Sequence, residues 1–309
     1  MKIGFFSEAG YEGKVPRDHP NMRTDVAWVC ALDATHHPIF NIGNLEDNTY
    51  DVGIMILPKN RTTLMEFPLL EHYKRVCKKV TIMQESYYNY WQDSEISEQI
   101  WYFNFIVEMD LIFCHNNIDR IYYNGLTNVR TELLPSLMIT DNVQRKNNEG
   151  KGVIIGGNFV WAYGGFDSYN VASEITDDIT AVTTGRMKQE EEQLLKHIPW
   201  VFWGEWIKLL SNFKYGIQLG TASAGTFNLN CSFHGIPCIG YSNVDTQQKL
   251  HPLTTIEVGD IVKAKEIANK LKDDDFYNEC SKITKDRYEI HYSEEKFFKK
   301  VMGILNEIN

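Results

Sequence analysis

Short apolar blocks alternate with longer amphipathic stretches through the first half of the chain. An apolar block bounded by polar or turn residues predicts a buried strand, and apolar residues at helical spacing predict a helix packed on a sheet. The predicted strands are Lys2–Phe6, Pro38–Ile42, Val52–Leu57, Val80–Gln84 and Leu111–Cys114, and the predicted helices are Asp25–Asp33, Thr63–Val76, Ser94–Met109 and Ile118–Tyr123. Strands that alternate with helices predict βαβ units and a parallel sheet.

The same alternation begins again at Val153. The predicted strands are Val153–Ile155, Ile179–Val182, Trp200–Trp203, Tyr215–Leu219 and Pro237–Tyr241, and the predicted helices are Asp167–Ile175, Glu190–His197, Trp206–Phe213 and a short helix through Asn230 to His234. From Asp260 onward the pattern is helical throughout. The sequence therefore predicts an α/β protein with two Rossmann-like domains.

The segment DNVQRKNNEGKG, residues 141–152, separates the two halves. It is polar, contains glycine and has almost no apolar side chains, as is typical of inter-domain linkers. We therefore expect one domain over residues 1–140, a linker over 141–152 and a second domain over 153–309.

Composition and charge narrow the class of protein. A length of 309 residues favours two domains, and a net charge of −10 argues against a general polyanion binder. The six cysteines form no C-x-x-C pair, which predicts reduced, buried thiols in a cytoplasmic protein and no zinc site. No apolar run is long enough to span a membrane, and the apolar start is interrupted at Glu8, too early for a signal peptide.

Candidate ligand-binding loops follow the predicted strands of the second half. In an open parallel sheet, ligands bind outside the carboxyl ends of the strands. Those ends carry Gly156-Gly157-Asn158, Thr183 to Arg186, Gly204-Glu205, Ser223-Ala224-Gly225-Thr226 and Ser242 to Asp245. Backbone N–H groups at helix N-termini bind phosphate, and Arg186 would add a charge-assisted hydrogen bond. These loops predict an anion-binding site.

Their residues resemble motifs of the GT-B glycosyltransferases, which hold a nucleotide sugar mainly in their C-terminal Rossmann domain. Gly156-Gly157 looks like the family's glycine-rich turn, and Arg186 with Lys188 is similar to its basic pair on the diphosphate. Ala224-Gly225-Thr226 through Gly235-Ile236-Pro237 looks like its loop, helix and Gly-x-Pro turn on phosphate and ribose.

Two positions depart from the family pattern. Asn230 stands where a ribose-binding acid is often found, and Glu191 stands where the family's lysine is expected, so that only Lys188 remains to serve. The resemblance implies two domains facing each other across a cleft, with the final helix, Glu295 to Ile308, packed back on the N-terminal domain. The donor-binding residues it implies are Gly156, Gly157, Asn158, Arg186, Lys188, Glu205, Ser223, Ala224, Gly225, Thr226, Asn230 and Asp245.

The small residues Ser223 to Thr226 directly precede the predicted helix. If a diphosphate lies against their backbone, a side chain larger than Ala at Gly225 would take the space of a phosphate oxygen. Gly225→Val is then expected to abolish donor binding at a nearly unchanged apo melting temperature. Alternatively Gly225 only forms a tight turn, and the same substitution lowers apo stability.

The N-terminal half resembles, more faintly, a phage DNA β-glucosyltransferase. Shared features are the Met-Lys-Ile start, a long polar first loop, the acid Glu85 after the fourth strand and the Gly-Gly-x-Phe turn at Gly156 to Phe159. An acid or histidine at a strand end suits a general base that activates an acceptor hydroxyl. The candidates for this catalytic role are Glu85, His19, Asp18 and Asp25.

Three of the four base candidates also have a structural explanation. Glu85 would cap the next segment or pair with a lysine, His19 would be a loop residue beside Pro20, and Asp25 would occupy the first turn of a helix, where acids are favoured. The aromatic run from Tyr87 to Trp91 indicates either core packing or a stacking surface for a sugar or base.

The expected function is metal-independent transfer of a hexosyl or pentosyl group from a nucleotide sugar, UDP-linked by the resemblance, to an acceptor hydroxyl. The nucleotide sugar is a co-substrate, and no cofactor is expected. The acceptor is a glycan, a small molecule or, by the phage resemblance, a hydroxymethylated base in DNA. A nucleotide-sugar epimerase and a non-catalytic two-lobed binding protein remain as alternatives, and stereochemistry and oligomeric state stay open.

Overall fold

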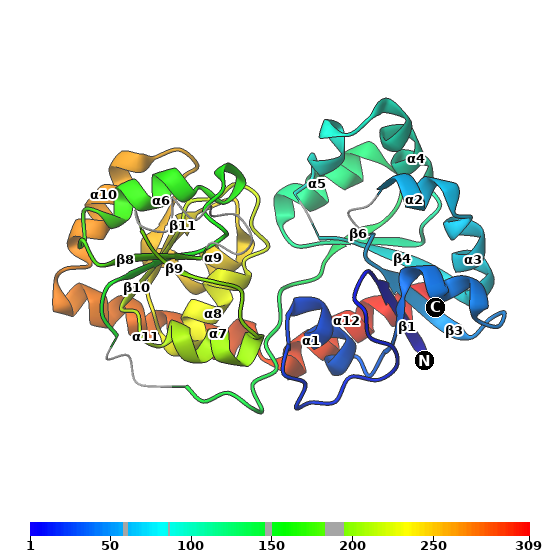
Figure 1. Cartoon of the computed structure of the whole chain (residues 1–309), viewed down its shortest axis with the longest axis horizontal. Coiled ribbons are helices and arrows are strands. Elements are labelled where there is room, and N and C mark those ends of the chain that lie inside the picture. Colours follow the sequence, from blue (N-terminus) through cyan, green and yellow to red (C-terminus); the bar gives the residue numbers. More distant parts are fainter. Residues whose placement is uncertain (58–60, 86, 146–149, 183–194) are drawn as a thin grey trace. The chain divides into compact units, whose positions relative to one another are not determined.

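The computed structural model describes residues 1–57, 61–85, 87–145, 150–182 and 195–309. These residues divide into two compact units, each with its own sheet. The first unit contains Met1–His19, Asp25–Pro135 and Glu294–Asn309, and the second contains Pro20–Thr24 and Ser136–Ser293. Figure 1 shows a layered α/β arrangement in each unit.

The first sheet has the strand order β2-β1-β3-β4-β5-β6, with every neighbouring pair parallel. Its strands are β1 (Ile3–Ser7), β2 (Thr35–Pro38), β3 (Tyr50–Met55), β4 (Cys77–Gln84), β5 (Leu111–Cys114) and β6 (Thr131–Leu133). Its helices are α1 (Thr24–Ala31), α2 (Arg61–Glu66), α3 (Leu69–Val76), α4 (Ile96–Ile106), α5 (Asn117–Leu126) and α12 (Glu294–Ile308), with 3₁₀ turns η1 (Ile39–Asn44) and η2 (Tyr90–Asp93).

Helices α2 to α5 cover one face of the first sheet, and α1 and α12 cover the other (Figure 1). The core under α3, α4 and α5 contains Phe6, Tyr73, Phe105 and Ile112, all buried. Trp91 belongs to this core and stacks on Tyr102 with ring centroids 4.2 Å apart. The core-packing explanation of the aromatic run is therefore right for Trp91. The final helix α12 is tied to the same unit by an ion pair between Arg130 and Glu307 at 2.7 Å.

The second sheet has the order β12-β11-β10-β7-β8-β9 and is also parallel throughout. Its strands are β7 (Val153–Ile155), β8 (Ile179–Val182), β9 (Lys196–Ile198), β10 (Tyr215–Gln218), β11 (Cys238–Tyr241) and β12 (Thr255–Ile256). Its helices are α6 (Gly165–Ala172), α7 (Trp203–Leu210), α8 (Thr226–His234), α9 (Asp245–Leu250), α10 (Ile261–Lys270) and α11 (Asp274–His291), with 3₁₀ turns η3 (Trp161–Tyr163) and η4 (Pro252–Thr254). Two parallel sheets confirm the predicted α/β class.

Some predicted elements are wrong or shifted. The second strand is Thr35–Pro38, whereas the predicted strand Pro38–Ile42 begins where β2 ends and lies mostly in a 3₁₀ turn. The predicted helix Thr63–Val76 divides into α2 and α3, because Pro68 has no N–H to continue a helix.

The region before α7 is also shifted. The predicted helix Glu190–His197 is wrong at its end, because Lys196–Ile198 forms strand β9, which pairs with β8. The strand predicted at Trp200–Trp203 is wrong as well. Trp203 begins α7 and packs inward with Ile207 and Leu210, one helical turn apart. Residues 190–194 and 146–149, which belong to the predicted helix and linker, lie outside the described residues.

Candidate functional site

The order of strands in the second sheet reverses between β7 and β10. The chain runs from β7 to β8 and β9 on one side, then returns to add β10, β11 and β12 on the other. At such a switch point the connections leave in opposite directions, and the space at the carboxyl ends of the two strands is where open α/β sheets bind ligands. The loops after β7 and β10 are therefore the centre of the candidate site.

The loop after β7 has an unusual backbone. Gly157, Asn158 and Phe159 have successive φ values of +87°, +58° and +46°, in the left-handed region that non-glycine residues rarely occupy. A side chain at Gly157 would also collide with Tyr163 and Gln218. Backbone strain of this kind concentrates at ligand-binding sites. Gly156 is constrained too, because a side chain there would meet the ring of Phe227 about 2.5 Å away.

The loop after β10 is held by the hydroxyl groups of small side chains, Ser223 within the loop and Ser136 outside it. The Ser223 hydroxyl donates to Gln218 Oε1 at 3.0 Å and accepts from the Gly225 N–H at 3.0 Å. The Ser136 hydroxyl donates to the Ala224 carbonyl at 2.9 Å and lies 3.2 Å from the Thr226 hydroxyl. The N-cap residue of α8 is Gly225, which has no side chain with which to cap the first turn. The N-terminus of α8 therefore presents N–H groups that an anion is able to accept from.

Gly225 is a packing position, which corrects the expectation that Gly225→Val leaves apo stability unchanged. Its φ is +79°, and a Cβ there would lie 2.5 Å from Thr246 Cβ and Oγ1. Thr246 is buried and receives a hydrogen bond from the Tyr292 hydroxyl at 2.9 Å, so it has no room to retreat. Only glycine fits, whether or not a phosphate is bound.

We expect Gly225→Ala to lower the free energy of unfolding of the ligand-free protein by about 2–4 kcal/mol, the sum of left-handed strain and overpacking. Gly259→Ala is the matched control, because Gly259 has a φ of +86° but no atom within 4 Å of a Cβ. It should cost only the strain, about 1 kcal/mol. Equal losses in the two variants, measured by chemical denaturation, would contradict steric packing against Thr246.

The other residues predicted to bind the donor lie in different parts of the second unit or outside the described residues. Asn230 is buried within α8, with its amide oxygen accepting from Trp206 Nε1 at 2.8 Å and its nitrogen donating to the Thr226 carbonyl at 3.3 Å. Glu205 is exposed in the first turn of α7, rather than in a loop at a strand end as predicted. Asp245 begins α9 after β11. Arg186 and Lys188 lie outside the described residues.

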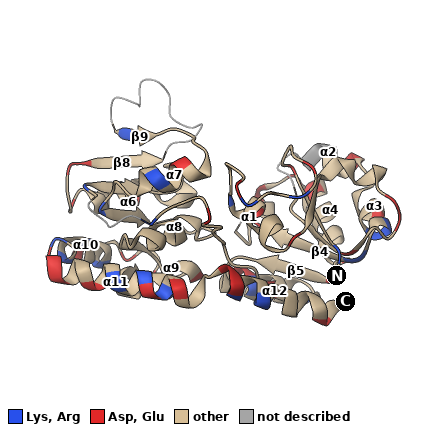
Figure 2. Cartoon of the chain, turned by 90° about the horizontal axis from the view of Figure 1, so that it is seen from below, with Lys and Arg blue, Asp and Glu red and all other residues tan. Residues whose placement is uncertain are grey.

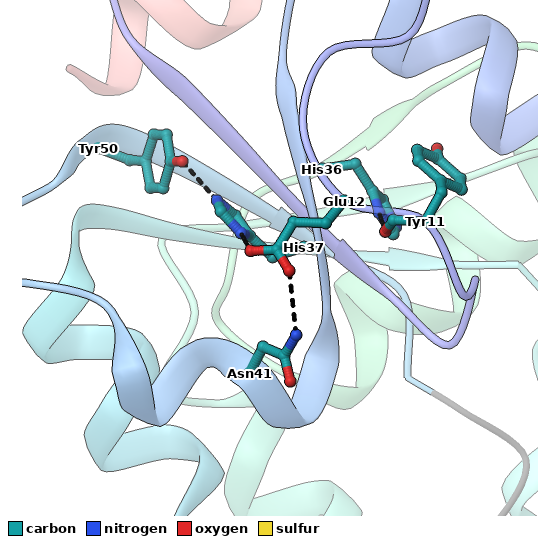
Figure 3. A network of polar contacts seen from close by, with 6 residues as sticks. All are labelled: Tyr11, Glu12, His36, His37, Asn41 and Tyr50. Carbon is teal, nitrogen blue, oxygen red and sulfur yellow. Dashed lines mark hydrogen bonds and ion pairs between the residues drawn. The ribbon is translucent and has the colours of Figure 1, made fainter.

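In the first sheet the strand order reverses between β1 and β3, so the loop after β1 occupies the corresponding position. Polar contacts fix this loop on β2 (Figure 3). The Tyr11 ring stacks on His36 with centroids 3.9 Å apart. Glu12 accepts from His37 Nδ1 at 3.0 Å and from Asn41 at 3.2 Å, and the other nitrogen of His37 meets the Tyr50 hydroxyl.

The protonation of His36 follows from its partners. Nδ1 lies 2.7 Å from the Tyr11 carbonyl, so this nitrogen carries the proton, and Nε2 accepts from the Ser7 hydroxyl at 2.8 Å. Burial lowers the pKa of His36, and the Tyr11 carbonyl and the charge of Asp25 offset part of this effect. The ring is therefore neutral at pH 7 and orders the loop between Ser7 and Tyr11.

The structure brings only some of the predicted catalytic residues together. Asp25, half-buried in the first turn of α1, is close enough to raise the pKa of Tyr11 further beyond the effect of burial. The ring of His19 lies 6.0 Å from that of Tyr11. Asp18 is exposed in the same loop, and Glu85 is exposed directly after β4. The charge of Asp25 thus acts on both Tyr11 and His36, whose rings stack on each other, whereas Glu85 follows a different strand, β4.

Sequence reasoning missed His115, which follows β5 directly. Its side chain is buried beside Trp28, with ring centroids 5.6 Å apart. Within the described residues its ring has one backbone contact, with Leu134, which falls short of good hydrogen-bond geometry, and at least one ring nitrogen has no partner at all. Burial lowers its pKa to about 4, and the Leu134 backbone offsets only part of this. The buried Tyr11 hydroxyl also lacks a partner there. Unsatisfied buried groups are uncommon in folded proteins, so a water or a ligand is expected to supply the missing partner. The signal in the sequence was a histidine after the apolar block Leu111–Cys114.

Solved structures with the same two sheets show which fold this is. HepE from Anabaena, solved with UDP and glucose, aligns with a TM-score of 0.67 and 11% identity over 99% of each chain. WaaG, a glycosyltransferase involved in lipopolysaccharide biosynthesis, aligns with a TM-score of 0.66 and 10% identity over 98% of this chain and 99% of its own. The chain has the GT-B fold.

Longer GT-B proteins match in part. TarM aligns with a TM-score of 0.60 and 10% identity over 82% of this chain, which spans about half of TarM, 54% of its length. No protein-family model matches the sequence, and no curated protein sequence matches it significantly. The GT-B assignment therefore rests on the fold.

Among the described residues of this GT-B chain, no three His, Cys, Asp or Glu side chains are grouped as metal ligands. Within the same part of the chain, no helix combines the length and the apolar character that crossing a bilayer requires.

Proposed function

We propose that this protein is a glycosyltransferase that moves a sugar from a nucleotide-sugar donor to a hydroxyl of an acceptor. The observation that carries the proposal is the switch point of the second unit, where the left-handed turn Gly157–Phe159 and the uncapped N-terminus of α8 both follow adjacent strands. Exposed backbone N–H groups at that place suit the diphosphate of the donor. The GT-B fold supports the same reading.

The donor is proposed to be UDP-linked, because HepE was solved with UDP-glucose and the pneumococcal O-GlcNAc transferase GtfA with UDP and GlcNAc. Transfer is proposed to be metal-independent, with leaving-group charge stabilised by backbone N–H groups and by the predicted pair Arg186 and Lys188. Whether a hexosyl or a pentosyl group moves is left to the assay. The acceptor is proposed to be a glycan.

Acceptor activation is proposed to involve the first unit. The acceptor oxygen bonds to the anomeric carbon as the bond to the donor phosphate breaks, and a base takes the hydroxyl proton. Asp25 is our choice among the predicted bases, since it is half-buried and its charge acts on Tyr11 and on His36, whose ring is held by the Tyr11 carbonyl and the Ser7 hydroxyl. His115 is proposed to contact a substrate hydroxyl.

The test is a panel of nucleotide sugars incubated with the purified protein and a mixture of glycan, small-molecule and hydroxymethylated-DNA acceptors. Release of free nucleotide that depends on one donor and one acceptor, and survives a chelator, supports metal-independent transfer. Interconversion of the donor sugar without nucleotide release would indicate an epimerase. Thermal stabilisation by free sugar but not by UDP would indicate a binding protein, whereas a UDP concentration of 100 Kd should add about 2.7 kcal/mol.

A further inference from the structure

The loop after β11 contains an amide oxygen without a partner. This loop, residues 242–244, joins β11 to α9 at the carboxyl edge of the second sheet. The side-chain oxygen Oδ1 of Asn243 is shielded from solvent and makes no hydrogen bond within the described residues. Folded proteins rarely leave a shielded polar atom unpaired, so this oxygen calls for a hydrogen-bond donor from outside the described part of the chain.

The orientation of the Asn243 amide follows from its nitrogen. Nδ2 donates to the carbonyl oxygen of Thr221 at 2.8 Å. Exchanging the amide oxygen and nitrogen would set two acceptor oxygens against each other, so this hydrogen bond determines which atom is which. Oδ1 therefore points in a different direction from the Thr221 carbonyl, and its partner must be an O–H or N–H group.

Asn243 lies beside the loop after β10, which is proposed to hold the diphosphate. Its amide is bonded to Thr221 near the start of that loop, and a Cβ on Gly225, at the end of the loop, would lie 2.5 Å from Thr246. Asn243 and Thr246 are only three residues apart in the chain. The chain after β11 thus follows the loop after β10 along its length, with the unpaired oxygen at one end.

This oxygen supplies a kind of group that α8 lacks. The helix carries no Lys, Arg, Asp or Glu (Figure 2), and its side chains from Phe227 to His234 are all buried. It offers a ligand the N–H groups of its first turn, which donate to phosphate oxygens. The ribose and the sugar on either side of a diphosphate carry hydroxyl groups, which also need acceptors. An amide oxygen suits them, because it accepts without the repulsion that a carboxylate would exert on the diphosphate.

We propose that Asn243 Oδ1 accepts a hydrogen bond from a ring hydroxyl of the bound nucleotide sugar, on the ribose or on the transferred sugar. The assignment rests on the proposed function, because it takes the diphosphate to lie against the loop after β10 and the first turn of α8. Asn243 is then a binding residue that selects for that hydroxyl. A ligand without it leaves the shielded oxygen unpaired, which is how a polar site rejects a deoxy analogue.

The test is isothermal titration calorimetry of the wild type and Asn243→Ala with UDP, 2′-deoxy-UDP, 3′-deoxy-UDP and UDP-glucose. Loss of one hydrogen bond should weaken binding about 5- to 10-fold. For a ribose hydroxyl, Asn243→Ala weakens UDP by this factor, and one of the deoxy analogues binds both proteins equally. For a sugar hydroxyl, it weakens UDP-glucose and leaves UDP unchanged. Either pattern is a pairwise coupling between one side chain and one hydroxyl.

Two further variants separate binding from structure. Asn243→Asp keeps an acceptor oxygen, so it should still discriminate against the ligand that lacks the hydroxyl, although its added charge weakens every diphosphate. Asn269→Ala on α10 is the matched control. Nδ2 of Asn269 likewise donates to a backbone carbonyl, that of Lys265 at 3.1 Å, but its Oδ1 accepts from Lys272 at 2.8 Å. This control should bind all four ligands as the wild type does.

Equal affinities of the wild type and Asn243→Ala for UDP and for UDP-glucose would overturn the assignment and leave Oδ1 to a bound water. Equal weakening of all four ligands in Asn243→Ala would also overturn it, as a loss of loop structure. In both cases UDP binds the wild type, so the proposed function stands. A wild type that binds neither UDP nor any other nucleoside diphosphate would overturn the proposed function together with the assignment.

Discussion

His115→Leu is expected to make the protein more stable at pH 7 and less active. Leucine has nearly the same volume as histidine, and it removes a buried ring of which at least one nitrogen has no hydrogen-bond partner among the described residues. Removing a buried polar group that lacks a partner should add about 1–3 kcal/mol to the free energy of unfolding. Losing a hydrogen bond to substrate should lower kcat/KM about 10- to 100-fold. Gained stability with lost activity is typical of a functional residue.

The pH dependence gives an independent readout. The pKa of His115 is about 4 in the folded protein, below its usual value near 6.5, so the unfolded state binds more protons between these two pH values. Acidification from pH 6.5 to pH 4 should therefore destabilise the wild type by up to about 3 kcal/mol through this residue alone. The His115→Leu variant should not show this contribution to the loss of stability between pH 6.5 and pH 4.

His251→Leu is the matched control. His251 is equally buried, and burial likewise lowers its pKa to about 4. Its hydrogen bonds are satisfied, however: Nε2 donates to the Asn228 carbonyl at 2.9 Å, and Nδ1 accepts from Cys238 N at 3.3 Å and from the Thr284 hydroxyl at 3.1 Å. We expect this variant to lose stability at pH 7. Destabilisation of both variants, or unchanged activity of His115→Leu, would remove His115 from the site.

Gly164→Ala should produce the largest loss of stability. Gly164 joins η3 to α6 with a φ of +67°, and a Cβ there would overlap the carbonyl oxygen of Leu219, the residue after β10. Neither backbone is free to move, because Ser168, in the first turn of α6, accepts a hydrogen bond from the Leu219 N–H at 2.9 Å. We expect the free energy of unfolding to fall by at least about 3 kcal/mol.

The comparison for this prediction is Gly204→Ala. Gly204 lies in α7 and has no atom within 4 Å of a Cβ, so alanine should be neutral or stabilise by up to about 1 kcal/mol. Equal denaturation midpoints for the two variants would show that the contact between Gly164 and Leu219 is absent in solution. A large difference would show that this contact holds the loop after β7 against the end of β10.

The repetition of strand and helix, and therefore the parallel α/β class, follows from the sequence alone. Leu111–Cys114 was predicted to the residue, because a continuous apolar block between polar segments has few alternatives to a buried strand. The loops after β7, β10 and β11 were also predicted, since each follows an apolar block that the pattern identifies as a strand. The local pattern of apolar and polar residues is enough to predict a strand or a helix where burial and local propensity favour the same element.

Where burial and local propensity disagree, the tertiary structure determines which secondary structure forms. Thr35–Pro38 is a strand although it contains two histidines, because Ser7, Tyr11 and Tyr50, distant in sequence, provide hydrogen bonds that make their burial possible. Lys196–Ile198 is a strand because β8 is there to pair with it. Gly225 must be glycine because Thr246 lies against it, and His115 became a candidate only once its buried, unsatisfied ring was seen. Partners brought together by folding set these outcomes, and no local pattern encodes them.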